Sequence, residues 1–257
     1  MYLIRGKHNL ELFKKLYKDT KLHATIGNFD GLHKGHQSIL SKIKKRAEET
    51  HASSIVFFTE PHASEYFAIS TNTNAEAPPR ICPWRKKFEL LEEYGIDFAF
   101  FLKFNSSLRK MTPETFISDI LEPVGLLSLT VGDDFRFGAN RAGDFQLLRE
   151  WGSKNNINVT NTETYLHLNE RVSSTRIRKA LLENNFSLAK ELLGRPYTFA
   201  GKVVHGQHLG RTIGIPTANI WLPKQKLPIS GVYAVRCSLD NKSIDGIANM
   251  GVRPTVG

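Results

Sequence analysis

Residues 25–36 read T-I-G-N-F-D-G-L-H-K-G-H, and this stretch carries the strongest structural signal in the chain. An apolar run ends at Gly27, a turn-rich segment follows, and apolar residues recur at helical spacing after His33. The order of strand, glycine-containing turn and helix predicts a phosphate-binding corner. The reason is that a helix N-terminus offers unpaired N–H groups and the positive end of its dipole.

Two histidines lie at the predicted start of this helix. His33 and His36 are three residues apart, so both imidazoles can project from the same side of its first turn. Gly31 and Gly35 allow the backbone to turn tightly and to approach a ligand closely. We interpret the stretch as a phosphate cradle with two histidines at its rim. The alternatives are a plain strand-to-helix turn with surface histidines, or a zinc site, for which two histidines without a nearby cysteine or carboxylate are a poor ligand set.

The composition indicates a globular protein of the cytoplasm. Apolar residues make up 40% and charged residues 23% of the 257 residues, which is ordinary for a soluble protein of one large or two smaller domains. Charged residues follow the start of the chain too closely to leave the apolar core of a signal peptide. No apolar run approaches the length of a membrane span. Cys82 and Cys237 lie far apart, as expected in a reducing compartment. We therefore expect no membrane partner.

The net charge of +10 suits a partner that carries phosphate. Nucleic acids and small polyphosphates both fit that charge, since basic surfaces bind phosphate backbones and also steer small anions. The densest basic run, at residues 42–46, lies on the polar side of the predicted amphipathic helix and is typical of a solvated face. We expect small-molecule polyphosphate substrates and no nucleic-acid partner.

Strands and helices alternate along the first two thirds of the chain. Apolar runs predict strands at residues 22–27, 53–58, 96–102 and 126–131, and amphipathic stretches between and after them predict helices. This alternation predicts a parallel sheet with right-handed crossovers. No G-x-G-x-x-G follows the first strand, which argues against a Rossmann oxidoreductase.

Polar groups follow three further predicted elements. Glu60 and His62 follow the second strand, G-D-D-F-R-F-G at residues 132–138 follows the fourth, and S-S-T-R-I-R at residues 173–178 opens a later helix. Because ligands gather at the carboxyl ends of parallel strands, we expect these groups near the cradle. The alternatives are an incidental loop histidine, a local ion pair and an ordinary capped basic helix.

The sequence changes character after a predicted helix at residues 187–193. Gly194 ends that helix and Pro196 prevents its return. Short apolar runs at residues 198–204, 232–238 and 243–248 are separated by glycine, proline and asparagine, which predicts a small all-β barrel. We place the domain boundary between residues 184 and 185.

These motifs resemble those of a known family. G-N-F-D-G-L-H-K-G-H is similar to the nucleotidyltransferase signature in the form carried by bacterial FAD synthetases, which join a riboflavin kinase to an FMN adenylyltransferase. G-x-D-F-x-F-G and S-S-T-x-I-R resemble motifs of the same family, whereas Pro61-His62-Ala63 departs from its usual Pro-His-Pro. The resemblance implies an α/β fold. A Rossmann-like parallel-sheet nucleotidyltransferase domain at residues 1–184 would precede a small all-β barrel riboflavin kinase domain at residues 185–257.

The resemblance also implies site residues for adenylyl transfer. His33 and His36 would hold the ATP phosphates, and Arg176 and Arg178 would close over the leaving pyrophosphate. Asp133 would orient substrate or metal. The residues implied in binding ATP and FMN are Gly27, Asn28, Phe29, Asp30, Gly31, Gly35, His62, Asp133, Phe135, Ser173, Ser174 and Thr175.

The second part of the chain resembles the riboflavin kinase module. Thr217 and Asn219 would hold Mg²⁺ beside ATP through neutral oxygens, which suit a hard cation that keeps several waters. Family members continue for several dozen residues past Gly257 and supply a catalytic glutamate there, so we expect the kinase half to be incomplete. The residues implied in binding ATP are Gly201, His205, Gly206, Gly210, Arg211, Gly214, Pro216, Thr217 and Asn219.

The function that the resemblance implies is flavin cofactor biosynthesis. ATP would phosphorylate riboflavin to FMN, and a second ATP would adenylylate FMN to FAD with release of pyrophosphate. Mg²⁺ is the implied cofactor. Two alternatives remain at this point: a tRNA-linked nucleotidyltransferase related to class I synthetases, and a non-catalytic protein that binds nucleotide or flavin.

Overall fold

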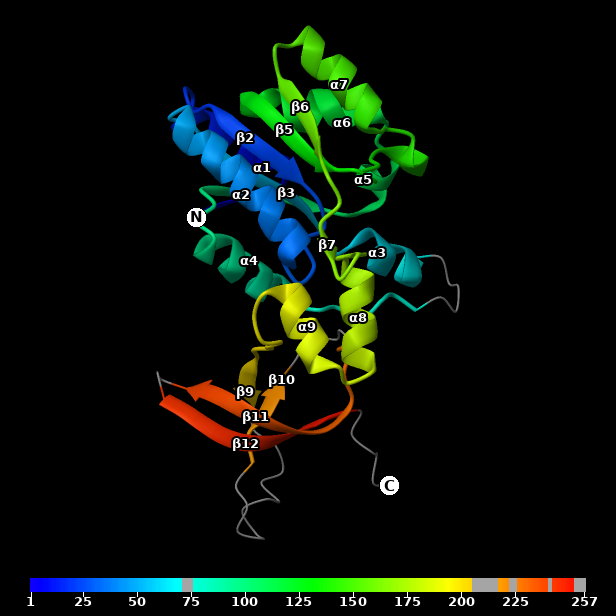
Figure 1. Ribbon diagram of the computed structural model, residues 1–257. Coiled ribbons are helices and arrows are strands. Elements are labelled where there is room, and N and C mark those ends of the chain that lie inside the picture. Colours follow the sequence, from blue (N-terminus) through cyan, green and yellow to red (C-terminus); the bar gives the residue numbers. More distant parts are fainter. Residues whose placement is uncertain (71–75, 205–216, 222–225, 240–241, 252–257) are drawn as a thin grey trace.

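The chain builds a parallel β-sheet with helices on both faces (Figure 1). The computed structural model describes residues 1–70, 76–204, 217–221, 226–239 and 242–251. The strands of the sheet are β1 (Tyr2–Arg5), β2 (Leu22–Ile26), β3 (Ser53–Glu60), β4 (Phe98–Lys103), β5 (Leu126–Gly132) and β6 (Asn158–Thr162). Their spatial order is β1-β4-β3-β2-β5-β6, and each neighbouring pair is parallel, as predicted.

The direction of strand addition reverses beside β2. From β2 the chain steps outward through β3 to β4, and it then returns to the other side of β2 to form β5 and β6. In open α/β sheets, ligands bind outside the carboxyl ends of the strands at such a reversal. The carboxyl ends of β2 and β5 therefore border the expected binding crevice.

Both faces of the sheet are buried, and β3 illustrates the consequence. Ile55 and Phe57 pack into one core cluster, whereas Val56 and Phe58 pack into the cluster on the opposite face. Cover on both sides accounts for the continuous apolar run of this strand. The helices that supply side chains to the two clusters include α1 (Gly6–Leu16), α2 (Lys34–Glu49), α4 (Trp84–Glu93), α6 (Pro113–Phe116), the π-helix η1 (Ile117–Leu121) and α7 (Phe145–Lys154).

Three helix starts carry the hydrogen bond of an N-cap, and the one at Ser173 was predicted from the sequence. The side chains of Thr112, Asp144 and Ser173 each accept from the backbone N–H three residues on, at 3.2, 3.0 and 3.2 Å. The helix that Thr112 caps becomes π-helical after one turn. Elements that the sequence patterns did not predict include α3 (Ala63–Ser70), β6 and the hairpin of β7 (Leu166–His167) with β8 (Glu170–Arg171).

A third core cluster joins α8 (Ser174–Leu182) to α9 (Phe186–Leu193). Ile177 and Leu181 of α8 are fully buried with Leu192 and Leu193 of α9. The predicted domain boundary falls in the short turn between these two packed helices. Among the described residues, no helix combines the length and the apolar character needed to cross a bilayer. Three short elements complete the first part of the chain: α5 (Ser106–Lys110), η2 (Glu122–Val124) and η3 (Ala139–Arg141).

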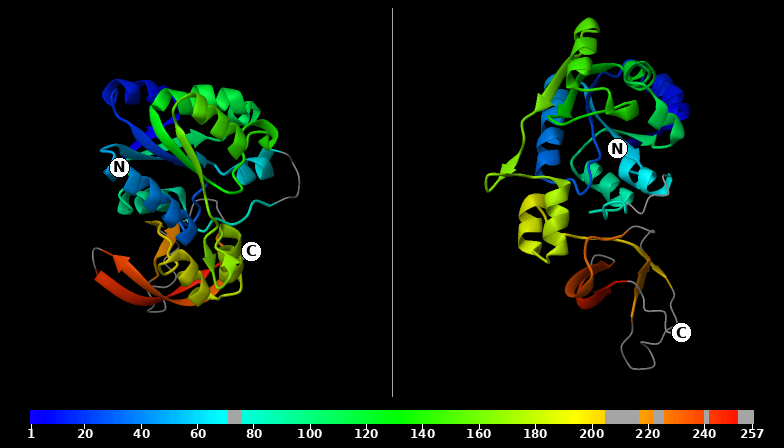
Figure 2. Two further views of the ribbon diagram at one scale, coloured as in Figure 1. Left: turned by 45° about the horizontal axis from the view of Figure 1, so that its top comes forward. Right: turned by 90° about the vertical axis from the view of Figure 1, so that its right-hand side faces the viewer.

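The last part of the described chain is all β, as expected. β9 (Lys202–Val204) pairs antiparallel with β10 (Asn219–Trp221), and β11 (Gly231–Leu239) pairs antiparallel with β12 (Lys242–Met250). Figures 1 and 2 show these strands beyond α8 and α9, on the side away from the parallel sheet. The rings of Phe186 and Tyr233 pack edge to face across this contact. The two small sheets agree with a β domain, and its closure into a barrel stays a prediction.

Gly152 marks a close approach between α7 and β6. A Cβ at this position would lie 2.5 Å from Val159 Cγ2 and 2.6 Å from the backbone oxygen of Ile157. We expect Gly152→Ala to lower the free energy of unfolding by about 1–3 kcal/mol, because β6 would have to move away from the helix. Urea unfolding followed by circular dichroism measures the change. Lys154→Ala, at an exposed position of the same helix, serves as the control, and equal stability of the two variants would contradict this packing.

Candidate active site at the carboxyl edge of the sheet

The predicted phosphate cradle forms the turn between β2 and α2. His33 caps the helix, since its Nδ1 accepts a hydrogen bond from the backbone N–H of His36 at 3.3 Å. A ring nitrogen that accepts carries no proton, so neutral His33 has its proton on Nε2. The cradle therefore offers an anion two kinds of donor, namely this Nε2–H and the free N–H groups of the first helical turn.

The two imidazoles lie face to face, with ring centroids 3.6 Å apart and planes at 17°. This agrees with the prediction that His33 and His36 project from the same side. Burial, together with the nearby positive charges of Arg171, Arg178 and Arg195, lowers the pKa of His33 to about 4. Burial likewise holds the pKa of His36 well below its usual value. Both rings are therefore neutral hydrogen-bonding groups near pH 7, surrounded by fixed cations.

One buried ring nitrogen of the stacked pair has no hydrogen-bond partner in the described part of the chain. His36 Nδ1 is buried and makes no hydrogen bond among the described residues. Buried polar atoms in folded proteins are nearly always paired, with ordered water or ligand where protein groups are lacking. This nitrogen is therefore available to a ligand or to a bound water.

Two glycines of the motif are required by close contacts. Gly31 has φ +79°, and a Cβ there would lie 2.7 Å from Ile81 Cγ2. A Cβ at Gly35 would lie 3.2 Å from two ring atoms of His33. Any other residue at these positions would displace the cradle or the imidazole that it presents.

Asp30 joins three segments of the chain. Its carboxylate is 2% exposed and accepts from the backbone N–H groups of Ile81 and Cys82 at 3.2 and 3.3 Å. Arg178 Nη2 donates to the same carboxylate at 2.6 Å, and Arg178 Nε donates to Pro79 O at 2.7 Å. The buried carboxylate of Asp30 and the half-buried guanidinium of Arg178 thus form an ion pair that ties the cradle to residues 79–82 and to α8.

Arg176, the other cation of the S-S-T-R-I-R motif, is held by the β7–β8 hairpin. Its Nη1 donates to the backbone oxygens of His167 and Glu170 at 2.9 and 3.1 Å. Its Nε lies 3.0 Å from the Glu170 carboxylate, which is 70% exposed. Asp133, from the loop after β5, pairs with Arg171 of the same hairpin at 3.0 Å. The hairpin therefore brings the G-D-D-F motif beside the start of α8.

The remaining residues of the cradle differ in exposure. Gly27 extends the sheet by donating its N–H to Phe57 O at 3.1 Å. Asn28 is exposed, whereas Phe29 is buried beneath the cradle, where its ring centroid lies 5.0 Å from that of His36. Phe29 therefore supports the imidazole pair from the core.

The other hydroxyl and aromatic groups named by the resemblance lie on α8 and after β5. Ser173 caps α8, and Ser174 Oγ donates to the backbone oxygen of Asp30 at 3.0 Å. Thr175 is exposed at the first turn of the helix. Phe135 stacks on Phe137, with centroids 5.7 Å apart, and packs against the first core cluster.

A cluster of buried charged groups follows the carboxyl end of β3. The guanidinium of Arg80, only 2% exposed, pairs with Glu60 and Glu65. Lys87 is fully buried, with its Nζ 3.1 Å from His62 Nε2 and 3.9 Å from a carboxylate oxygen of Glu60. Because an ammonium has only donors, His62 Nε2 accepts, and burial lowers the pKa of His62 to about 2. His62 is therefore neutral and held in one tautomer.

Sequence patterns identify His62 in this cluster but miss Arg80 and Lys87. Lys87 occupies the buried face of α4 together with Leu90 and Leu91. A lysine at an apolar-face position is the signal that could have found it. Arg80 precedes the helix in an irregular segment and carries no comparable signal.

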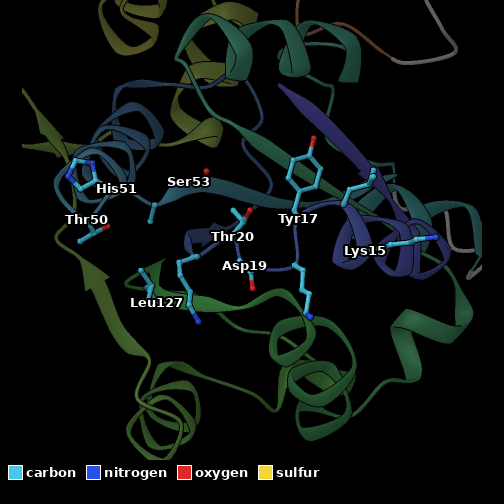
Figure 3. A pocket seen from close by; sticks show the side chains of 12 residues that line it. Lys15, Tyr17, Asp19, Thr20, Thr50, His51, Ser53 and Leu127 are labelled. Atoms are coloured by element: carbon cyan, nitrogen blue, oxygen red, sulfur yellow. The ribbon is translucent and has the colours of Figure 1, made fainter.

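A cavity of about 630 Å³ lies at the opposite edge of the sheet (Figure 3). It is lined by residues 15–21 and 50–53 and by Leu127, which lie where β2, β3 and β5 begin. Helices α1 and α2 end there, and helix C-termini repel anions. We therefore place the candidate active site at the cradle rather than in this cavity.

Two family models match the chain. The model described as FAD synthetase covers residues 16–176, and the model described as riboflavin kinase covers residues 193–257. The chain belongs to the FAD synthetase family. Its two matched regions correspond to the parallel-sheet part and to the β part of the fold, with the α8–α9 pair at their junction.

Relatives of this FAD synthetase-family chain share both regions. Proteins named bifunctional riboflavin kinase/FMN adenylyltransferase from Escherichia coli K12 and Pseudomonas fluorescens are each 42% identical over all of this chain and over 80% and 79% of their own lengths. The protein of that name from Haemophilus influenzae is 39% identical over all of this chain and 80% of its own. These identities extend across the domain junction.

A solved structure extends the likeness to the fold. A crystal structure of a protein named as a macrolide-efflux protein from Streptococcus pneumoniae superposes with a TM-score of 0.79 at 25% identity. The match covers 100% of this chain and 81% of that chain. It therefore includes both the parallel sheet and the β region of this FAD synthetase-family chain.

The riboflavin kinase region is described at three of its predicted residues. A Cβ at Gly201 would lie 2.5 Å from Ile220 Cγ2 and from Trp221 O, so β9 and β10 approach this closely only with glycine. Thr217 and Asn219 are exposed, and their neutral oxygens fit Mg²⁺ in a site completed by water and phosphate. The described residues contain no cluster of three His, Cys, Asp or Glu side chains fit for a metal. Outside the described residues lie His205, Gly206, Gly210, Arg211, Gly214 and Pro216.

The depressed pKa of His33 predicts how stability depends on pH. The pKa is about 4 in the folded protein and 6.5 in the reference state, so the unfolded chain binds more protons between these values. The contribution to the free energy of unfolding is therefore complete above about pH 6.5 and is lost as the pH falls toward about 4.

His33→Asn keeps a capping acceptor but does not titrate, so it should flatten part of this pH dependence. The pH dependence of the free energy of unfolding that remains in this variant comes from other buried histidines, including His36 and His62, whose pKa values are also lowered. Urea unfolding across this pH range measures the effect. An identical pH dependence in the variant and the parent would show that His33 is not buried in its neutral form.

Proposed function

We propose that this chain is a bifunctional enzyme of flavin cofactor biosynthesis. Its first domain, at residues 1–184, would transfer the adenylyl group of ATP to FMN, and its second, at residues 185–257, would phosphorylate riboflavin with ATP. The observation that carries the proposal is the cradle, in which neutral imidazole donors at a helix N-terminus are surrounded by arginines. Both family matches in one chain, and relatives named for both activities, support it.

Adenylyl transfer is an in-line displacement at the α-phosphorus of ATP. A phosphate oxygen of FMN forms the new P–O bond, and the bond to the bridging oxygen breaks as pyrophosphate leaves with the electron pair. Such a reaction needs alignment and neutralisation of developing negative charge rather than a covalent intermediate. We assign the first task to His33 and His36, which would hold the ATP phosphates through N–H donors.

The two arginines of the S-S-T-R-I-R motif would act differently. The partner of Arg176 is the exposed carboxylate of Glu170, so this ion pair can be exchanged for pyrophosphate. The partner of Arg178 is the buried carboxylate of Asp30, so Arg178 would contribute positive charge without leaving its position. Asp133, paired with Arg171, would orient substrate or metal at the neighbouring loop.

The kinase reaction would use Mg²⁺ near the start of β10. Thr217 and Asn219 would hold the ion, which when bound neutralises charge on the ATP phosphates. Their exposure leaves room for the waters and phosphate oxygens that complete an octahedral shell. The riboflavin hydroxyl would attack the γ-phosphorus, giving FMN and ADP.

We propose a cytoplasmic location for this activity. Cys82 and Cys237 are both free thiols. Free cysteines persist in a reducing compartment, where disulfides are rare. A tRNA-linked role is less well supported, since the named relatives are enzymes of flavin metabolism.

Incubation with FMN, ATP and Mg²⁺, followed by chromatography of the flavins, tests the first activity. The parent chain should form FAD and pyrophosphate. We expect His36→Ala to lower the rate by about 10²–10³-fold, because a preorganised donor to the phosphates is lost. His51→Asn, which changes a histidine at the opposite edge of the sheet, is the control and should match the parent. FAD formation by His36→Ala at the parental rate would refute the assignment.

The two activities should be separable at Asn219. In a chain extended to the full length of its relatives, Asn219→Ala should reduce formation of FMN from riboflavin, because the Mg²⁺–ATP complex loses an oxygen ligand. The same variant should convert supplied FMN to FAD at the parental rate, because its substitution lies in the other domain. Loss of both activities together would contradict two independent sites.

A further inference from the structure

Three backbone carbonyl oxygens converge behind the phosphate cradle. Gly31 O and Leu32 O belong to the cradle itself, and Leu193 O belongs to the last turn of α9. Arg195 Nη2 donates to Gly31 O at 2.6 Å, and its Nη1 donates to Leu32 O and Leu193 O at 3.2 and 3.3 Å. Gln37 Nε2 donates to Leu32 O and Leu193 O, both at 2.7 Å. We call these five residues the junction cluster.

The junction cluster joins the two family regions of the chain. Leu193 and Arg195 lie at the start of the region that matches the riboflavin kinase model. Gly31, Leu32 and Gln37 belong to the region that matches the FAD synthetase model. Gly194, with φ +72°, turns the chain sharply after α9, so that the side chain of Arg195 reaches back to the cradle.

A simpler role for Arg195 would be to cap α9. Carbonyls of a last helical turn lack helical partners, and the bond from Arg195 to Leu193 O meets that need. The bonds to Gly31 O and Leu32 O are not explained by capping, because those carbonyls lie in another segment. The bond to Gly31 O is the shortest of the three hydrogen bonds that Arg195 donates.

The half-buried Arg195 guanidinium forms no ion pair with a carboxylate in the part of the chain that the structure describes. Within the described residues its hydrogen bonds all go to backbone carbonyls. Glu93 attracts this charge without forming an ion pair with it. The charge also acts at the front of the cradle, since Arg195 is one of the cations that lower the pKa of His33. The peptide that carries Leu32 O also carries the His33 N–H, so a cation on that oxygen strengthens the dipole that points toward a bound phosphate.

We propose that Arg195 is a positioning residue for adenylyl transfer, which holds the Gly31 and Leu32 carbonyls so that the cradle keeps the geometry that binds the triphosphate of ATP. The first residues of the second domain thereby help to position the nucleotide site of the first domain. This inference rests on the proposed function. It assigns Arg195 no contact with substrate.

Steady-state kinetics of FAD formation from supplied FMN separate positioning from simple structural support. In Arg195→Gln we expect the KM for ATP to rise by about 10- to 100-fold, because two charged hydrogen bonds to the cradle are lost. The KM for FMN should stay at its parental value. The KM for ATP of Arg195→Lys should lie between those of the parent and Arg195→Gln, since an ammonium is a point charge that cannot span three carbonyls.

Arg149→Gln is the matched control. It removes the same charge from an exposed position on α7, so the KM for ATP should not change. Melting temperatures measured for each variant report whether the fold is kept. Should Arg195→Gln fail to fold, Arg195→Lys supplies the comparison, because it keeps the charge and loses only the fork geometry.

Three outcomes overturn the proposal. In Arg195→Gln, the first is an unchanged KM for ATP, and the second is a rise of the KM for FMN equal to that for ATP. The third is a fall in kcat with both KM values unchanged, which would indicate only a smaller folded fraction. If the parent chain makes no FAD, the proposed function fails. Titration calorimetry with ATP alone then still tests Arg195, and equal affinity in the parent and in Arg195→Gln would reject its positioning role.

Discussion

The ion pair between the buried carboxylate of Asp30 and Arg178 is the interaction on which the candidate site depends. The carboxylate is 2% exposed and binds two backbone N–H groups as well as the guanidinium, so it joins the cradle, residues 79–82 and α8 at one point. A buried charge that loses its partner is strongly disfavoured, and this penalty keeps the three segments in a single arrangement. The junction cluster restrains the same turn from behind.

Around this pair, different residues donate hydrogen bonds and carry the positive charge. The imidazoles of His33 and His36 are neutral, and the positive charge comes from arginines that stay protonated at any pH of interest. Neutral donors beside fixed cations can bind a polyanion without changing their own protonation state. This arrangement suits displacement at phosphorus, in which charge is redistributed along the phosphate chain and the enzyme has little covalent chemistry to perform.

Local sequence signals predicted most of the first domain, and the features that they missed have physical reasons. Periodicity located β2 to β5, and the S-S-T-R-I-R motif located the start of α8, because each signal lies within a few residues. The edge strand β6 reads N-V-T-N-T and α3 buries no side chain, so neither shows an apolar pattern. Motif residues of the site could be named singly, but the pairing of Asp30 with Arg178 spans 148 residues and required the fold.

The same long separations set the order in which the site can be assembled during synthesis. The cradle leaves the ribosome early, yet two of the side chains that secure it, Arg178 and Arg195, lie 148 and 164 residues further along. A nascent chain that ends before these arginines can form β2, β3 and α2 but lacks both of these bonds to the turn. The proposed nucleotide site is thus complete only as the second domain begins to emerge, and by then the whole parallel sheet, which ends with β6, has been translated.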